Sequence, residues 1–479
     1  MNRKAIKTIL MLTMLAAAAI VFTGCSDDDD NQMTGPVMGD GAMLRVVHAS
    51  PDAPAVDVYV NDMTTPVLRG LGYTMTSSYL DIDAGVYNVQ LRAAGAASSS
   101  MPAFETGDLT IPDGAVITAV AMGLLGSADA ADKFRVVPMV EAFADPGAGN
   151  AAVRIVHASA DAPAVAIDVM NDGTPEISDF ARFAETGADG VALPAGEALQ
   201  VGIWAGDPLA RVTAFTTPAL PEADLFLIAV GLLGELPRDE AGFGLLAVGP
   251  QGTVGLIRQN PVVYGLHGSP DAPAVDVLVG GTSAVLMADL AFGELSPPVQ
   301  VPPASYSLDF AAAGGTAVAA SATTPELMAG ERYLAVATGF LIDGSVDFQL
   351  LPVGESFSDS GAPLVRVVHA SPDAPAVDVG TWDGMTFGAV GDYTNLAFGD
   401  ASAAMGTALP AQALTIGVAA TGASSPVATF DIAPADGLKA FAVAAGSLTG
   451  IGESFRLVIV DASAWPWAAV EVMPNAMAR

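Results

Sequence analysis

The amino-acid sequence predicts an all-β protein with four tandem β-sandwich domains. One short string recurs four times at domain-sized intervals, and apolar and polar residues alternate with a period of two around it. The 51 glycines and 33 prolines indicate frequent turns. After the N-terminal leader, no stretch shows the amphipathic pattern of a helix of about 12 or more residues.

The repeated string reads HASPDAPAVDV at His48 and at His369, HGSPDAPAVDV at His267 and HASADAPAVAIDV at His157. Consecutive motif histidines are 109, 110 and 102 residues apart. These intervals suit one domain each and exceed the period of solenoid repeats, which is about 20 to 50 residues. Four copies of one domain therefore explain the repetition best.

Turn-rich stretches separate the copies at DPGAGN (145–150), RQNP (258–261) and SFSDSGAP (356–363). The predicted domains span residues 43–145, 151–257, 258–357 and 363–479. Their size is that of immunoglobulin-like sandwiches, although the cysteines and tryptophan of antibody domains are missing, so the prediction concerns the architecture only. We expect each domain to have a separate core.

The N-terminus predicts a lipoprotein leader. Residues 1–24 combine three basic residues with the apolar run ILMLTMLAAAAIVF, and FTGC ends at Cys25, the only cysteine of the chain. Because this pattern resembles a lipobox, we expect a lipid on Cys25 that anchors the protein to a bacterial membrane. With one cysteine, no disulfide can form within the chain.

Residues 25–42 begin with SDDDD after the cysteine and predict an acidic tether. Its acidic run resembles the surface-export signal of some Gram-negative lipoproteins, and a simple spacer is the alternative. The expected location is the outer membrane of the bacterial cell envelope, with the domains facing either the periplasm or the cell surface. The formal net charge of −34 makes nucleic acid an unsuitable partner.

Within the first copy, Leu44, Val46 and His48 share one face of a predicted strand, and Arg45 and Val47 share the other. The string SPDAP then interrupts the strand, as a tight corner requires. This pattern predicts a buried histidine at the end of a strand, followed by a corner and a second strand.

The motif allows three interpretations. In a catalytic site, His48 would be the base, Asp52 or Asp57 its orienting carboxylate, and Ser50 the nucleophile. In a metal site, the carboxylates would favour calcium and the histidine zinc, but no further histidine or cysteine can complete a zinc site. In a structural corner, the histidine is buried and Asp52 accepts backbone amides.

We favour the structural corner and expect no catalytic residue, metal or cofactor at the motif. The residues concerned are His48, Asp52 and Asp57, then His157, Asp161 and Asp168, then His267, Asp271 and Asp276, and finally His369, Asp373 and Asp378.

The string RVVHASPDAPAVDVYV resembles the signature of the family called domain of unknown function 4397. That resemblance covers nearly the whole chain after the leader and implies an extracytoplasmic β-domain without an established activity. The third copy departs by Tyr264 in place of the motif arginine and by Gly268 in place of alanine. The second copy has Ala160 in place of proline and is aligned with two extra residues before Asp168.

An anchored row of sandwiches is typical of proteins that present binding loops away from a membrane. We therefore expect a non-catalytic binding, adhesion or structural array, with an extracellular glycan or protein as its ligand. The alternative is an extracytoplasmic hydrolase or metal-binding protein that uses the repeated His and Asp residues.

Overall fold

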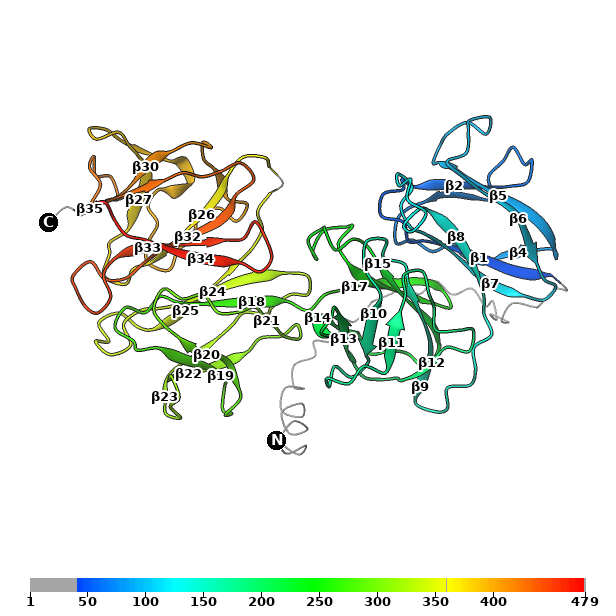
Figure 1. Cartoon of the computed structure of the whole chain (residues 1–479), viewed down its shortest axis with the longest axis horizontal. Coiled ribbons are helices and arrows are strands. Elements are labelled where there is room, and N and C mark those ends of the chain that lie inside the picture. The colour runs from blue at the N-terminus through cyan, green and yellow to red at the C-terminus, as the bar shows by residue number, and fades with distance from the viewer. Residues whose placement is uncertain (1–40, 359, 478–479) are drawn as a thin grey trace, which may run out of the picture.

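The computed structural model describes residues 41–358 and 360–477. Within this part of the chain the protein is all-β, with eight sheets of four or five strands and a single 3₁₀ turn, η1 (Gly391–Tyr393). The sheets form four tandem sandwiches, which confirms the predicted fold class (Figure 1). The leader, Cys25 and most of the acidic tether lie outside the described residues.

In each domain, the sheet that contains the motif strand is here named the inner sheet. In strand order, the inner sheet of domain 1 contains β4 (Leu80–Ile82), β1 (Ala42–His48), β7 (Val116–Met122) and β8 (Arg135–Val140). That of domain 2 contains β12 (Val191–Pro194), β9 (Asn150–His157), β15 (Asp224–Val230), β16 (Gly244–Gly249) and β17 (Gly252–Arg258). That of domain 3 contains β21 (Val299–Gln300), β18 (Val262–His267), β24 (Arg332–Thr338) and β25 (Gln349–Gly354). That of domain 4 contains β29 (Thr407–Ala408), β26 (Leu364–Ala370), β32 (Lys439–Ala445), β33 (Arg456–Asp461) and β34 (Ala468–Val472).

The second sheet of each domain is named the outer sheet. In domain 1 it contains β3 (Leu68–Leu71), β2 (Val56–Val60), β5 (Gly85–Ala93) and β6 (Phe104–Ile111). In domain 2 it contains β11 (Ile177–Phe180), β10 (Val165–Asp168), β13 (Gln200–Ala205) and β14 (Ala210–Thr216). In domain 3 it contains β20 (Val285–Leu290), β19 (Val275–Val279), β22 (Ser307–Ala312) and β23 (Val318–Thr323). In domain 4 it contains β28 (Phe387–Ala389), β27 (Val377–Trp382), β30 (Leu414–Ala420), β31 (Ala428–Ile432) and β35 (Ala476–Met477).

The inner sheets are apolar on both faces. In β15, Leu225 and Leu227 pack in the core of domain 2, whereas Phe226 and Ile228 face domain 1. Strand β9 pairs in parallel with β15, and both are almost fully buried. Strands buried on both faces are nearly continuous apolar runs, which accounts for the high mean hydropathy of +0.48. Among the described residues, no helix has the length and apolar character needed to cross a membrane.

The inner sheets of neighbouring domains pack face to face, so the four sandwiches form two pairs (Figure 1). One shared core joins domains 1 and 2 and includes Val47 and Val120 from the first and Phe226 from the second. Another joins domains 3 and 4 and includes Val336 from the third and Phe441 from the fourth. Each domain has a core of its own between its two sheets, as expected. The expectation that the four domains are independent is wrong, because the second apolar face of each inner sheet is covered by its neighbour.

The two pairs are joined by polar contacts between domains 2 and 3. Arg238 lies in the loop between β15 and β16 and donates two hydrogen bonds, of 2.8 and 3.0 Å, to the Glu355 carboxylate. Glu355 is only 2% exposed, so this bidentate ion pair is largely removed from solvent. Arg258 is the last residue of β17 and pairs with Gly244 of β16, so the boundary between domains 2 and 3 falls just after Arg258.

Candidate functional site

The four motif histidines have the same surroundings. Each is at most 2% exposed, at the end of the first inner-sheet strand or next to it. The ring Nε2 lies 3.2 Å from the Pro54 carbonyl oxygen in domain 1 and 3.0 Å from the equivalent oxygen in the other three. A carbonyl can only accept, so Nε2 carries the hydrogen. Burial lowers the pKa of all four rings below 6.5, so they are neutral at pH 7.

The motif serine ties the corner to the neighbouring strand. Ser50 Oγ donates to the carbonyl oxygen of Gly123 at 2.6 Å, directly after β7. The same bond links the other serines to Gly231, Gly339 and Gly446, at 2.8, 2.7 and 2.6 Å. Gly123 has φ +86°, and a Cβ there would lie 2.6 Å from the Lys133 carbonyl oxygen, so only glycine fits. The glycine that ends each apolar run is thus part of the corner.

The first motif aspartate holds the loop after this glycine. Asp52 accepts the backbone N–H groups of Leu125 and Gly126, both at 2.8 Å. Asp161, Asp271 and Asp373 bind the equivalent loops. In domain 4, Asp373 also accepts the hydroxyls of Ser447 and Thr449 at 2.6 Å. The carboxylates therefore join the corner after the motif strand to the loop after its parallel neighbour, two segments about 70 residues apart in the sequence.

The second motif aspartate joins two loops of the outer sheet. Asp57 accepts the N–H groups of Gly70 and Gly95 at 2.8 and 3.0 Å. These bonds from Gly95 and Gly70 lower the pKa of Asp57 below 3.8. Asp276 and Asp378 make the same two contacts in domains 3 and 4.

Asp168 does not occupy this position, which corrects the alignment of the second copy. Asp57 pairs with Arg92 across β2 and β5, and the residue in the matching place of domain 2 is Ala166, which pairs with Trp204. Asp168 instead accepts the N–H groups of Asp172 and Gly173 in the turn that follows β10. The register of paired strands, in which Val165 matches Val56, therefore determines which residue is equivalent to Asp57, and the nearest aspartate in the sequence is not that residue.

The geometry does not assemble the catalytic or metal arrangement. The histidine donates to a proline carbonyl and the serine to a glycine carbonyl, and no hydrogen bond in the described residues joins the ring to the serine hydroxyl or to a motif aspartate. Likewise, no group of three His, Cys, Asp or Glu side chains placed to hold a metal ion occurs in residues 41–358 and 360–477. What the motif residues do in this structure is connect strands and loops.

The motif arginine position bridges the paired domains, a role that sequence reasoning missed. Arg45 donates through Nη1 to the Gly249 carbonyl oxygen of domain 2 at 2.6 Å, and Arg154 donates to the Val140 carbonyl oxygen of domain 1 at 2.7 Å. Val140 and Gly249 have the same place in their inner sheets. The contacts are therefore reciprocal, as at the interface of a symmetric dimer. The feature of the sequence that could have indicated this role is a charged residue, Arg45, on the second face of an otherwise apolar strand.

The pair formed by domains 3 and 4 replaces one of these arginines. Arg366 donates to the Gly354 carbonyl oxygen of domain 3 at 2.6 Å, as in the first pair. The reciprocal contact, from domain 3 to domain 4, is made by Tyr264 in place of an arginine. Tyr264 is fully buried and stacks on Trp467 of domain 4, with ring centroids 4.5 Å apart. Its hydroxyl accepts the backbone N–H of Trp467 at 3.0 Å. The departure at Tyr264 is thus an aromatic substitute for a polar bridge.

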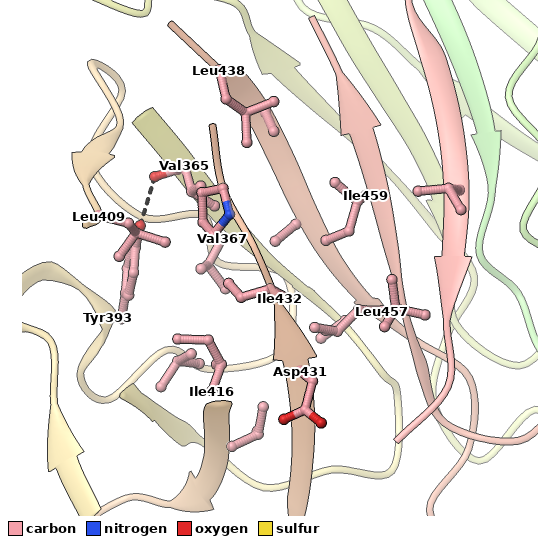
Figure 2. A pocket seen from close by; sticks show the side chains of 18 of the residues that line it. Val365, Val367, Tyr393, Leu409, Ile416, Asp431, Ile432, Leu438, Leu457 and Ile459 are labelled. Atoms are coloured by element: carbon pink, nitrogen blue, oxygen red, sulfur yellow. Dashed lines mark hydrogen bonds between the residues drawn. The ribbon is translucent and has the colours of Figure 1, made fainter. Parts of the chain in front are cut away.

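Apolar cavities lie between the two sheets of domains 1 and 4, with volumes of about 230 and 310 Å³. Figure 2 shows the larger one, with Val367, Ile416 and Leu457 around an open space between the sheets. The Tyr393 hydroxyl at its side is occupied by a 2.7 Å bond to the Val365 carbonyl oxygen. In domain 2 the corresponding space is only about 40 Å³ and is lined partly by phenylalanines.

Comparison with known proteins identifies the family of this chain. The model of the family described as domain of unknown function (DUF4397) matches residues 42–168 and 262–380, which together make just over half of the chain. No curated protein matches the chain. A solved structure titled "The Bacillus anthracis TIE protein" shares 11% identity over 85% of this chain and 66% of that one, with a TM-score of 0.14. The chain thus covers slightly less than two thirds of that protein, and so low a TM-score carries no argument.

Proposed function

This chain belongs to the DUF4397 family, and we propose that it is a non-catalytic binding array anchored to the bacterial cell envelope through a lipid on Cys25. The family has no established activity, so the proposal rests on the geometry of the described residues and on the leader sequence. The observation that carries it is the use of every motif side chain inside the fold. A reactive group must be free to meet a substrate, whereas each motif ring (through Nε2), serine hydroxyl and aspartate carboxylate makes at least one hydrogen bond inside the fold, and the ring Nδ1 atoms of His48, His157 and His369 are buried without a partner.

The architecture supports binding in a second way. Paired sandwiches give two stiff units, and the residues left outside the cores are those of loops and outer-sheet faces. Such surfaces on a rigid scaffold are where binding residues are usually found. An extracellular glycan or protein is the ligand that this arrangement suits, and the acidic tether of residues 25–42 would hold the array away from the lipid.

Two measurements test the proposal. Mass spectrometry of the mature N-terminus should find a lipid-modified Cys25, and an unmodified end would contradict the anchor. For the activity, the chain from residue 41 onward, which contains every described strand, is assayed against ester, glycoside, phosphoester and peptide substrates beside a glycan-binding screen. We expect binding without turnover. Turnover that disappears in Ser50→Ala would contradict the non-catalytic function and favour a hydrolase.

A further inference from the structure

The inter-sheet cavity of domain 4 has the size and lining of a ligand site. Its volume of about 310 Å³ reaches the range of small-molecule pockets, which begins near 300 Å³. Most of its lining side chains are Val, Ile, Leu and Ala. The His369 Nε2 and the Tyr393 hydroxyl bond to the carbonyl oxygens of Pro375 and Val365, and the His369 Nδ1 is the buried nitrogen of the lining without a hydrogen-bond partner. An apolar space of this kind is poorly suited to water and well suited to hydrocarbon.

Domain 4 carries a small side chain at a position that an aromatic ring fills in domain 3. Val418 in β30 pairs with Val379, and the same place in domain 3 holds Phe310, which pairs with Val277. Phe310 is 3% exposed and packs edge to face on Phe348, with centroids 4.8 Å apart. The fold therefore accepts a phenyl ring at this position, and domain 4 carries a smaller side chain there. Domain 1 has Leu91 in the equivalent place, beside its cavity of about 230 Å³.

The cavity of domain 4 reaches the protein surface at the edge of the inner sheet. Val470 and Val472 of β34 contribute to its lining, and Val470 is 60% exposed. Strand β34 is the last strand of that sheet. An apolar side chain at the mouth of an apolar cavity gives a hydrocarbon chain a route of entry without breaking either sheet.

The charges exclude an anionic ligand. No lysine or arginine is found among the described residues that line the cavity, so a carboxylate or phosphate would have no partner there. Asp431, at the outer face of β31, is the one acidic residue of the lining, and its carboxylate accepts the Thr415 hydroxyl at 2.6 Å. The net charge of −34 adds a general repulsion of anions. An uncharged ligand avoids both costs.

We propose that the inter-sheet cavities of domains 4 and 1 each bind one uncharged, chain-like apolar molecule. This inference rests on the proposed binding function and names a ligand class for it. A cavity of about 150 Å³ holds benzene, so about 310 Å³ corresponds to a chain of about twelve carbons, and the smaller cavity to about nine. Domains 2 and 3, with phenylalanines between their sheets, then serve to join the two binding domains.

The test uses methyl octanoate, which has nine carbons and so fits both cavities, as the neutral probe and octanoate at pH 8 as its anionic match, with the chain from residue 41 onward. Native mass spectrometry counts bound molecules, and calorimetry gives the affinities. We expect two molecules of the ester per wild-type chain, one for Val418→Phe and none for Val418→Phe with Leu91→Phe. Octanoate should bind at least tenfold more weakly. Ala442→Leu, which fills the same cavity from the inner sheet, is the second variant should Val418→Phe fail to fold.

The outcomes separate the two proposals. Absence of binding to the folded wild type, or binding that the filled variants retain, would overturn the cavity proposal and leave the non-catalytic array in place. Tighter binding of octanoate would overturn the charge argument and with it the ligand class. Hydrolysis of the bound ester would contradict the non-catalytic function while supporting the site. Stoichiometric binding of intact ester that falls stepwise in the variants is the result expected.

Discussion

The interface between domains 1 and 2 and the interface between domains 3 and 4 have the same design but differ in their central contacts. In the first pair, Arg45 and Arg154 each donate to the end of a strand in the other domain. In the second, Arg366 does so in one direction, and Tyr264 stacked on Trp467 replaces the other arginine. One sheet-on-sheet geometry thus accepts either a buried cation or an aromatic stack, provided that its apolar face is covered.

The comparison predicts the largest loss at the aromatic contact. Tyr264→Ala removes a fully buried ring and leaves a space beside Trp467, so we expect a loss of about 3–5 kcal/mol in unfolding free energy. Tyr264→Phe keeps the ring and loses only the hydrogen bond from the backbone N–H of Trp467, at a cost of about 1 kcal/mol. Urea unfolding of the chain from residue 41 onward measures both. Equal losses in the two variants would show that the ring does not stabilise the pair.

At the polar interface, Arg45→Met should cost about 3 kcal/mol. Arg45 is 2% exposed, and its removal leaves the nearby Glu141 carboxylate, 3.3 Å from it, and the Gly249 carbonyl without this partner. Replacing both charges, in Arg45→Met with Glu141→Gln, should recover much of the loss, since no unpaired charge then remains. The same urea experiment checks this. A double variant less stable than Arg45→Met would contradict a role of the charge itself.

The motif histidine gives a third prediction. His369→Ala removes a 1% exposed ring and its bond to the Pro375 carbonyl, so a loss of about 1–3 kcal/mol is expected. Because domain 4 shares a core with domain 3, the loss should appear in the transition of both domains together. An unchanged midpoint of urea unfolding would show that His369 is not structural and would direct attention back to a chemical role for it.

The smallest effect concerns pH and should be equal in the two pairs, which contain two motif histidines each. Burial lowers the pKa of these rings from 6.5, so as the pH falls toward 6.5 the unfolded chain takes up protons that the folded chain does not, and stability is lost. Between pH 7.5 and 6.5, each pair should lose up to about 0.7 kcal/mol. Urea unfolding at both pH values tests the sign. Stability that rises on acidification would contradict neutral, buried rings.

The sequence predicted the sandwiches well because alternation of apolar and polar residues is a local property. Leu44, Val46 and His48 do face the interior, as their spacing indicated. It did not predict the pairing of domains, although the run LFLIAVGLLG already had apolar residues on both faces. Which sheet covers a second apolar face depends on contacts between distant segments, and no local pattern carries that information.

The candidate site shows the same limit. The four histidines and the first aspartates were identified from the string itself, whereas Asp168 was misaligned because register is set by the pairing of β10 with β13. The partners of the motif, such as Gly123 and Leu125, lie more than 70 residues away and meet it only through the parallel pairing of β1 with β7. The cavity depends on the difference between Val418 and Phe310, which has a meaning only after the ladders are aligned.

The central claim is that the structural unit of this protein is a pair of domains whose inner sheets share one core. Hydrogen exchange measured by mass spectrometry on the chain from residue 41 onward, with and without His369→Ala, tests it most directly. We predict faster exchange in β24 of domain 3 together with β32 of domain 4, and unchanged exchange in β15 of the other pair. Faster exchange confined to domain 4, with β24 as protected as in the wild type, would contradict the claim.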